Sequence, residues 1–214
     1  METSTLTIVF ELAVLLFSVV LHEVSHGYAA LFLGDKTAKY AGRLTLNPIA
    51  HLDPVGSLLV PVLSSLAGVP FGWARPVPFN PYNLRNQKWG PAIVGVAGPL
   101  ANITLAVVFG LVIRFLPSFS NVLPGPFFFR FIEIAHIITF VNLFLAVFNL
   151  VPIPPLDGSK LLFAILSYRW HQTMLFLEQY GFFFLLFLLM FGGGEIIARV
   201  VWYIFYIVTG SSPI

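Results

Sequence analysis

Long runs of apolar residues alternate with short polar stretches along most of this chain. A helix rises about 1.5 Å per residue and the hydrocarbon layer of a membrane is about 30 Å thick, so runs of this kind predict membrane-spanning helices. The predicted spans cover residues 6–33, 91–116, 127–151, 174–191 and 195–208. The pattern therefore predicts an all-α polytopic membrane protein with about five to six transmembrane helices.

Residues 35–90 break this pattern. The stretch 35–53 is polar, which favours a loop or short strands, and prolines and glycines interrupt the short apolar run 54–70. Basic residues flank that run on both sides, and cytoplasmic loops of membrane proteins carry an excess of Lys and Arg. We therefore expect a re-entrant or short-strand region here, with 54–70 as a re-entrant dip or helical hairpin.

Composition agrees with a membrane protein. The 214 residues are 58% hydrophobic and only 9% charged, whereas soluble domains average about 25% charged residues. The net charge of +2 is small and no Lys/Arg stripe is present, which excludes nucleic-acid binding. The absence of cysteine excludes disulfides and thiolate metal sites. We expect a single integral membrane domain over residues 1–214.

One motif inside the first span carries chemistry: His22-Glu23-Val24-Ser25-His26. Histidines at i and i+4 lie on one face of a helix, where they can bind one zinc ion, and Glu23 between them can act as a general base. A buried polar cluster that only packs helices is the alternative. Ionisable residues inside a membrane are costly and usually functional, which favours the metal site.

A catalytic zinc usually takes a third protein ligand. The remaining candidates are Asp35, His51, Asp53, Glu133, His136, Asp157 and His171. Asp157 follows a segment with three prolines in four positions, which cannot be helical and is tolerated at membrane depth only where it lines protein or a water-filled cavity. A helix predicted from residue 159 places Asp157 near a helix N-terminus. We assign Asp157 as the third ligand, with a helix cap without metal as the alternative.

Three motifs in this order resemble the site-2 protease family of intramembrane zinc metalloproteases. They are the histidine motif at 22–26, Gly98-Pro99-Leu100-Ala101-Asn102, and the segment from Asn149 to Gly158. The resemblance covers a catalytic core of about residues 6–168, followed by C-terminal helices at 174–208. The resemblance is to a compact form of the family, and we expect no PDZ or CBS domain in this protein.

The resemblance implies a role for each matching residue. His22, His26 and Asp157 would bind one Zn²⁺ per chain, and Glu23 would be the general base and acid. Asn102 and Asn149 would line the catalytic cleft, where their amides could stabilise an oxyanion. Structural roles for these two asparagines, in hydrogen bonds to helix backbone, remain open alternatives.

The predicted function is that of a zinc-dependent intramembrane endopeptidase. Its expected partners are the lipid bilayer and transmembrane protein substrates, which must unwind locally and could pair with an extended segment at 35–53. The charge distribution places the active site toward the cytoplasm, and we expect the inner membrane of a prokaryotic cell. The alternatives are a metal-ion transporter or channel that uses the same His and Asp residues, and a protease-like scaffold that does not cut. Hydrolysis requires Glu23, whereas transport tolerates its loss.

Overall fold

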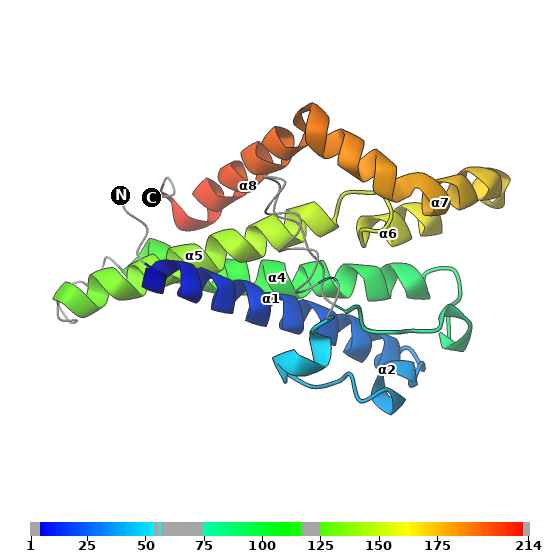
Figure 1. Ribbon diagram of the computed structural model, residues 1–214, viewed down its shortest axis with the longest axis horizontal. Coiled ribbons are helices and arrows are strands. Elements are labelled where there is room, and N and C mark those ends of the chain that lie inside the picture. Colours follow the sequence, from blue (N-terminus) through cyan, green and yellow to red (C-terminus); the bar gives the residue numbers. More distant parts are fainter. Residues whose placement is uncertain (1–4, 54–55, 57–74, 117–124, 212–214) are drawn as a thin grey trace.

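The computed structural model describes residues 5–53, 56, 75–116 and 125–211. Three long helices lie side by side along the long axis of the molecule: α1 (Thr5–Phe32), α4 (Gly90–Phe115) and α5 (Gly125–Asn149) (Figure 1). Each is long and apolar enough to cross a membrane. They confirm the first three predicted spans and the all-α fold class.

The helix α4 occupies the centre because one of its faces carries small residues. Its buried positions include Gly95, Gly98 and Gly110. Small residues allow helix backbones to approach closely, which matters in a membrane, where apolar surface alone gives little driving force for association. At Gly110 an added Cβ atom would lie 2.5 Å from a side-chain carbon of Val208, so only glycine fits against the C-terminal helix here.

The C-terminal part of the chain forms one bent path. The helix α7 (His171–Leu188) leads into a π-helical turn, η6 (Leu189–Gly193), and then into α8 (Gly194–Thr209). The bend includes Gly192, whose φ of +94° suits glycine and strains other residues. The two helices predicted at 174–191 and 195–208 are thus both present, as halves of a fourth candidate span, His171–Thr209.

The helix α8 packs on α4 and α5 and forms with them the main apolar core. The buried members of this core are Ala106, Ile113, Ala135, Leu143, Ile197, Val201 and Phe205. The first residues of α1 and the last residues of α8 lie at the same end of the molecule, on the left of Figure 1.

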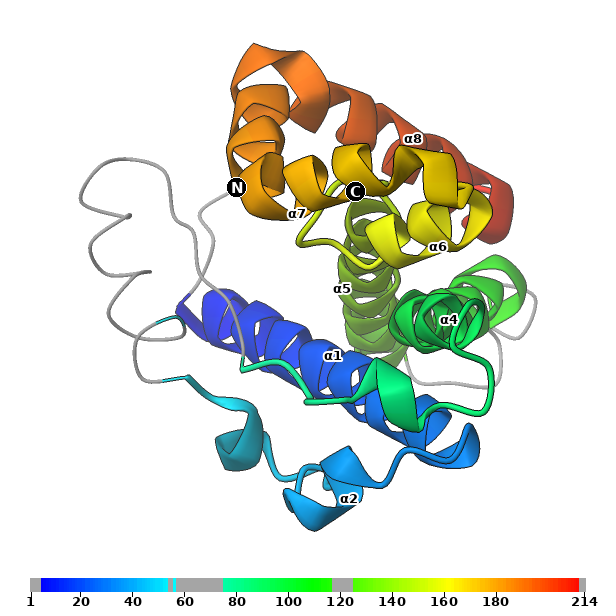
Figure 2. The same ribbon diagram turned by 90° about the vertical axis from the view of Figure 1, so that its right-hand side faces the viewer.

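The polar segments gather at the other end, where α1 ends. They contain three short helices, α2 (Thr37–Tyr40), η1 (Pro48–His51) and η3 (Pro81–Asn83). Viewed end-on, α2 lies on the side of α1 opposite to α7 and α8 (Figure 2). No strand occurs in the described part of residues 35–90, so a loop describes 35–53 better than short strands. The dip or hairpin predicted for 54–70 falls, apart from Gly56, outside the described residues.

The proline-rich segment after α5 is not helical, as predicted. Residues 150–157 form a series of turns before α6 (Gly158–Ile165) begins, and a 3₁₀ turn, η5 (Tyr168–Trp170), then leads into α7. The chain doubles back closely on the end of α5, since a Cβ atom added at Gly158 would lie 2.2 Å from the carbonyl oxygen of Leu150. This tight return determines where residue 157 lies.

Candidate active site

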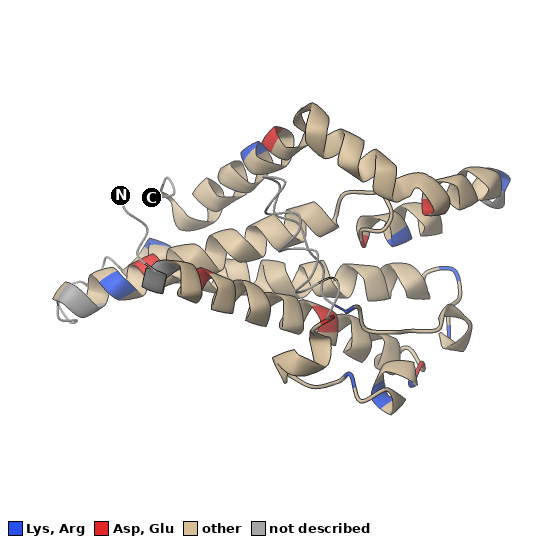
Figure 3. Cartoon of the chain, viewed as in Figure 1, with Lys and Arg blue, Asp and Glu red and all other residues tan. Residues whose placement is uncertain are grey.

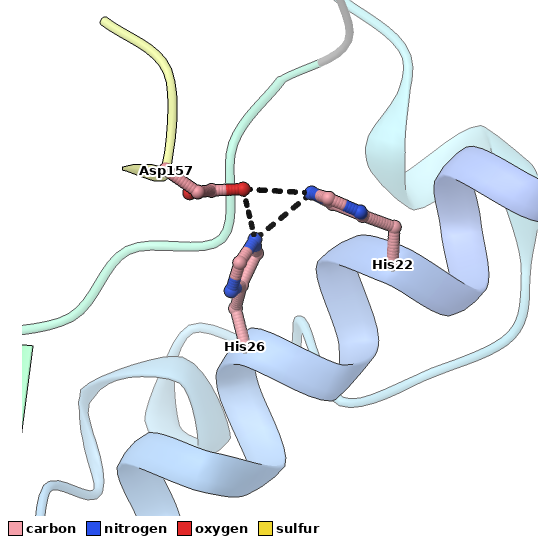
Figure 4. A group of neighbouring side chains, drawn as sticks. All are labelled: His22, His26 and Asp157. Atoms are coloured by element: carbon pink, nitrogen blue, oxygen red, sulfur yellow. Dashed lines mark hydrogen bonds and ion pairs between the residues drawn. The ribbon is translucent and has the colours of Figure 1, made fainter. Parts of the chain in front are cut away.

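His22 and His26 lie one turn apart on α1 and direct their imidazoles to the same point. Their Nε2 atoms are 3.0 Å apart, and both side chains are buried. Because 3.6 residues make one helical turn, this i, i+4 spacing places them on the same face. Figure 4 shows the two rings converging from neighbouring turns of the helix.

Asp157 completes the group from a distant part of the sequence. It precedes α6 and is buried, and its Oδ2 atom lies 3.0 Å from His22 Nε2 and 3.1 Å from His26 Nε2 (Figure 4). The side chain makes no capping hydrogen bond to α6. The contacts therefore do not favour the alternative that Asp157 is only a helix cap.

The opposite nitrogen of each imidazole also has a partner. His22 Nδ1 is 2.6 Å from Asn102 Oδ1, and His26 Nδ1 is 2.6 Å from the carbonyl oxygen of Val94. A carbonyl only accepts hydrogen bonds, so Nδ1 of His26 carries the proton and its Nε2 is a bare lone pair in the neutral ring.

A chain of buried amides assigns His22 in the same way. Asn142 Nδ2 donates to the carbonyl oxygen of Ile138, which directs Asn142 Oδ1 toward Asn102. Asn102 Nδ2 donates to that oxygen at 2.8 Å and to the carbonyl oxygen of Ser18 at 3.4 Å. Asn102 Oδ1 is thus left to accept the Nδ1 proton of His22. The Nε2 atom of His22 is therefore also a bare lone pair in the neutral ring.

Three hydrogen-bond acceptors consequently meet within 3.1 Å of one another: two imidazole Nε2 atoms and one carboxylate oxygen. In a buried site such an arrangement is unfavourable unless a cation, either a metal ion or a proton on one of the imidazoles, lies between the acceptors. Two histidines and a carboxylate are a donor set used by catalytic zinc, and the separations approach the about 3.3 Å expected between ligands at 2.0–2.1 Å from a tetrahedral zinc. The three residues could hold a metal ion.

The helix α4 leaves space beside this group at Gly98. A Cβ atom added there would lie 2.5 Å from His26 Nε2 and 2.6 Å from His22 Nε2. A side chain at position 98 would occupy the point where the lone pairs converge. The resemblance singled out this motif, and the close approach gives a physical reason for its glycine.

Glu23 follows His22 on α1 and is half-buried. Its Oε2 atom accepts a hydrogen bond of 2.8 Å from the backbone N–H of Val77, in an extended segment that runs from Arg75 to Asn80. The carboxylate is therefore held by backbone from a distant part of the chain. It does not belong to the group of residues that could hold the metal.

The two predicted cleft asparagines differ in their contacts. Both donor hydrogens of Asn102 are directed at Asn142 and Ser18, and its oxygen is directed at His22, so its contacts indicate a positioning residue. Asn149 is half-buried and donates to the carbonyl oxygen of Leu145 in its own helix at 2.9 Å. These contacts favour the structural alternatives, and the oxyanion role stays a prediction for both residues.

Asp35, another candidate ligand, is engaged elsewhere. Its buried carboxylate accepts hydrogen bonds from Thr37, from the backbone N–H of Asn80 and from the side chain of Asn83. Burial alone would raise the pKa of this carboxyl, but the hydrogen bonds outweigh it and hold the pKa below its ordinary value of 3.8. Asp35 thus anchors the loop after α1 to the extended segment.

The remaining candidates, His51, Asp53, Glu133, His136 and His171, join no metal-binding group within the described ranges. Among the residues that sequence reasoning missed are Ser18, Asn142 and Lys160. Ser18 precedes His22 by four residues, and Asn142 is an amide inside an apolar run. Polar residues within a predicted span were the signal that could have found Ser18 and Asn142, whereas Lys160 lies outside the predicted spans.

Comparisons with known proteins find relatives that are named as zinc metalloproteases. Residues 127–192 match the model of Peptidase family M50, a stretch that contains Asp157 and lies beyond the histidine motif. A Bacillus subtilis protein named "Putative zinc metalloprotease YwhC" is 37% identical over 177 residues, which cover 83% of this chain and 77% of that protein.

A Mycolicibacterium smegmatis protein named "Putative zinc metalloprotease Rip2" is 33% identical over 178 residues, 82% of this chain and 64% of that protein. A Methanocaldococcus jannaschii protein named "Zinc metalloprotease MJ0392" is 29% identical over 160 residues, 74% of this chain and 35% of that protein. No solved structure matches the chain significantly. By its sequence similarity the chain belongs to peptidase family M50, the site-2 protease family that its motifs resemble.

Proposed function

We propose that this protein is a zinc-dependent endopeptidase that hydrolyses peptide bonds within transmembrane segments of membrane proteins. The observation that carries the proposal is the convergence of Asp157 on His22 and His26, which lie with Glu23 in a helix apolar enough to span a membrane. His22 precedes the end of α1 by ten residues, which places the group about 15 Å along the helix from that end.

In this proposal His22 and His26 contribute Nε2 and Asp157 contributes Oδ2 to one zinc ion. A bound zinc supplies Lewis acidity, which polarises the scissile carbonyl and makes a water molecule easier to deprotonate. Asn102 and the Val94 carbonyl orient the imidazoles by holding their Nδ1 protons. Outer contacts of this kind commonly change metal affinity or activity by about 10–100-fold.

Glu23 would take the proton from the attacking water and pass it to the departing amide nitrogen. The hydrogen bond from Val77 to Oε2 leaves Oε1 for this task and restricts the rotation of the carboxylate. Because a peptide bond in a helix is enclosed by its own hydrogen bonds, the substrate must unwind. We expect efficient cleavage where Gly, Pro or polar residues weaken the substrate helix near the cytoplasmic boundary.

Glu23→Gln tests the proposal most sharply. The variant should retain zinc, because Glu23 is not among the proposed ligands, and should lose cleavage of single-span substrates in proteoliposomes. A Glu23→Gln protein that still cuts them would refute the proposal. Zinc uptake into liposomes by both proteins, without cleavage by either, would favour the transporter alternative.

We further propose that the site faces the cytoplasm and that the single domain over residues 1–214 acts in a prokaryotic inner membrane. The support is the gathering of basic residues near the metal group. Lys36, Lys39, Arg43, Arg75, Arg85, Lys88, Lys160 and Arg169 lie on the segments at that end of the molecule (Figure 3). Cytoplasmic loops are enriched in such residues.

A further inference from the structure

Lys160 contacts the oxygen of Asp157 that does not face the histidines. Its Nζ atom donates a hydrogen bond of 2.8 Å to Asp157 Oδ1, whereas Oδ2 lies against the two Nε2 atoms. The two oxygens of one carboxylate are therefore divided between a cation from the protein and the point where the lone pairs converge. Nothing in the function proposed above requires this division.

The Lys160 side chain is held along its length. A Cβ atom added at Gly95 would lie 2.9 Å from Lys160 Cδ and 3.0 Å from its Cβ, so the aliphatic stem lies directly on the backbone of α4. Its ammonium lies 5.4 Å from the centroid of the Phe79 ring, close enough for a cation–π contact. Only 29% of the side chain is exposed.

A carboxylate can bind a metal through one oxygen or through both. An ammonium group that donates to Oδ1 competes with the metal for that oxygen and disfavours two-oxygen binding. We propose that Lys160 is a positioning residue that makes Asp157 a one-oxygen ligand through Oδ2. The site then keeps three protein donors and an open fourth position for water, the arrangement that a catalytic zinc requires.

The same contacts connect the metal group to the extended segment. Phe79, under the ammonium of Lys160, lies two residues from Val77, whose N–H holds Glu23. Lys160 and Glu23 therefore both contact the segment from Arg75 to Asn80. The residue that contacts Asp157 and the proposed base are thus both held by the same segment of the chain.

This inference rests on the proposed function, because it assumes a metal at His22, His26 and Asp157. The competing reading is an ordinary i, i+3 ion pair that stabilises the start of α6. The two readings differ in the metal's coordination: a merely structural pair changes thermal stability, whereas a positioning residue changes the number of oxygens around the ion.

The test uses the full-length protein in detergent, loaded with Co²⁺, whose visible absorption is intense in four-coordinate sites and weak in higher coordination. Lys160→Met and Lys160→Gln should both weaken the visible bands, because Oδ1 of Asp157 is then free to bind the metal as well. Lys160→Arg, which can still donate to Oδ1, should restore the wild-type spectrum.

Lys88→Met is the matched control, because the Lys88 ammonium also lies over an aromatic ring, that of Trp89 at 5.7 Å, but makes no ion pair with Asp157. It should leave the cobalt spectrum unchanged. Wild-type spectra in both Lys160→Met and Lys160→Gln would overturn the inference alone. A wild-type protein that binds no cobalt at the two histidines would overturn both the inference and the proposed function.

Discussion

At the scale of single residues, the site depends on a chain of buried hydrogen bonds in which each donor and each acceptor is fixed by its neighbour. Asn142 determines the orientation of Asn102, and Asn102 determines which nitrogen of His22 carries the proton. Each step places an acceptor opposite a donor, so no step can be reversed without leaving a buried group unpaired. The network thereby leaves the Nε2 lone pair of His22 available for a metal.

Asn102→Ala removes the acceptor for the Nδ1 proton of His22. We expect zinc affinity to fall by about 10–100-fold, because the imidazole can then rotate or exchange its protonated nitrogen. Competition with a metal chelator measures this. Thr104→Ala, two residues along α4 at an exposed side chain that bonds its own helix, should leave affinity unchanged. Equal affinity in the wild type and Asn102→Ala would argue against the positioning role.

Gly98→Ala should abolish metal binding while the protein still folds. The added methyl group would lie 2.5–2.6 Å from both Nε2 atoms, where the ion would have to approach, and alanine favours helix more than glycine does. Metal content and gel filtration measure the two effects. Gly194→Ala, whose added Cβ atom meets nothing within 4 Å, is the control. Full metal content in Gly98→Ala would be incompatible with the proposed position of the ion.

At the scale of elements, the segment from Arg75 to Asn80 is held by side chains of α1 and of the loop that follows α1. Glu23 holds the N–H of Val77, Asp35 holds the N–H of Asn80, and Arg43 donates to the carbonyl oxygens of Arg75 and Pro76. Extended backbone without a neighbouring strand needs such partners for its polar groups. The segment can therefore support both Glu23 and Lys160.

Asp35→Asn should destabilise the protein by about 1–3 kcal/mol at pH 7, because buried donors lose a charged acceptor. The pKa of Asp35 is held below 3.8 in the folded protein. Its stabilising effect is therefore complete above the unfolded pKa and disappears as the pH falls through the lower, folded pKa. Thermal unfolding of both proteins across this range should give melting curves that converge in acid. A constant difference at all pH values would contradict the anchoring role of the charge.

Most of the elements could be predicted from the sequence, because uninterrupted apolar runs leave few alternatives to helices. Asp157 could be chosen for the site because prolines exclude helix before it. The contacts of Lys160 and Val77 could not be predicted, since they depend on how the returning loop and the extended segment pass α4 and α1. The bend at Gly192 lies in the gap between the spans predicted at 174–191 and 195–208, but its geometry could not be predicted, because three successive glycines are compatible with either a turn between two spans or a bend within one.

At the scale of the whole molecule, basic residues mark the end that carries the metal group, and the opposite end carries Arg114 and Arg130 (Figure 3). With α1, α4 and α5 running between the ends, the metal group lies closer to the basic end, inside the span of α1.

The absence of cysteine permits a direct test of this orientation. Single-cysteine variants Lys39→Cys and Arg130→Cys, both at exposed positions, should react with a membrane-impermeant maleimide from opposite sides. We expect Lys39→Cys to be labelled only from the cytoplasmic side. Labelling of Lys39→Cys from outside intact cells would contradict the proposed orientation and indicate the opposite one.

The central claim is that His22, His26 and Asp157 share one zinc ion, and X-ray absorption at the zinc edge tests it most directly. Purified wild-type protein should contain one zinc per chain, with two imidazole nitrogens and carboxylate oxygen at about 2.0–2.2 Å. Asp157→Asn should retain less zinc and change the spectrum of what remains. A wild-type spectrum without imidazole ligands, or full zinc content and an unchanged spectrum in Asp157→Asn, would contradict the account.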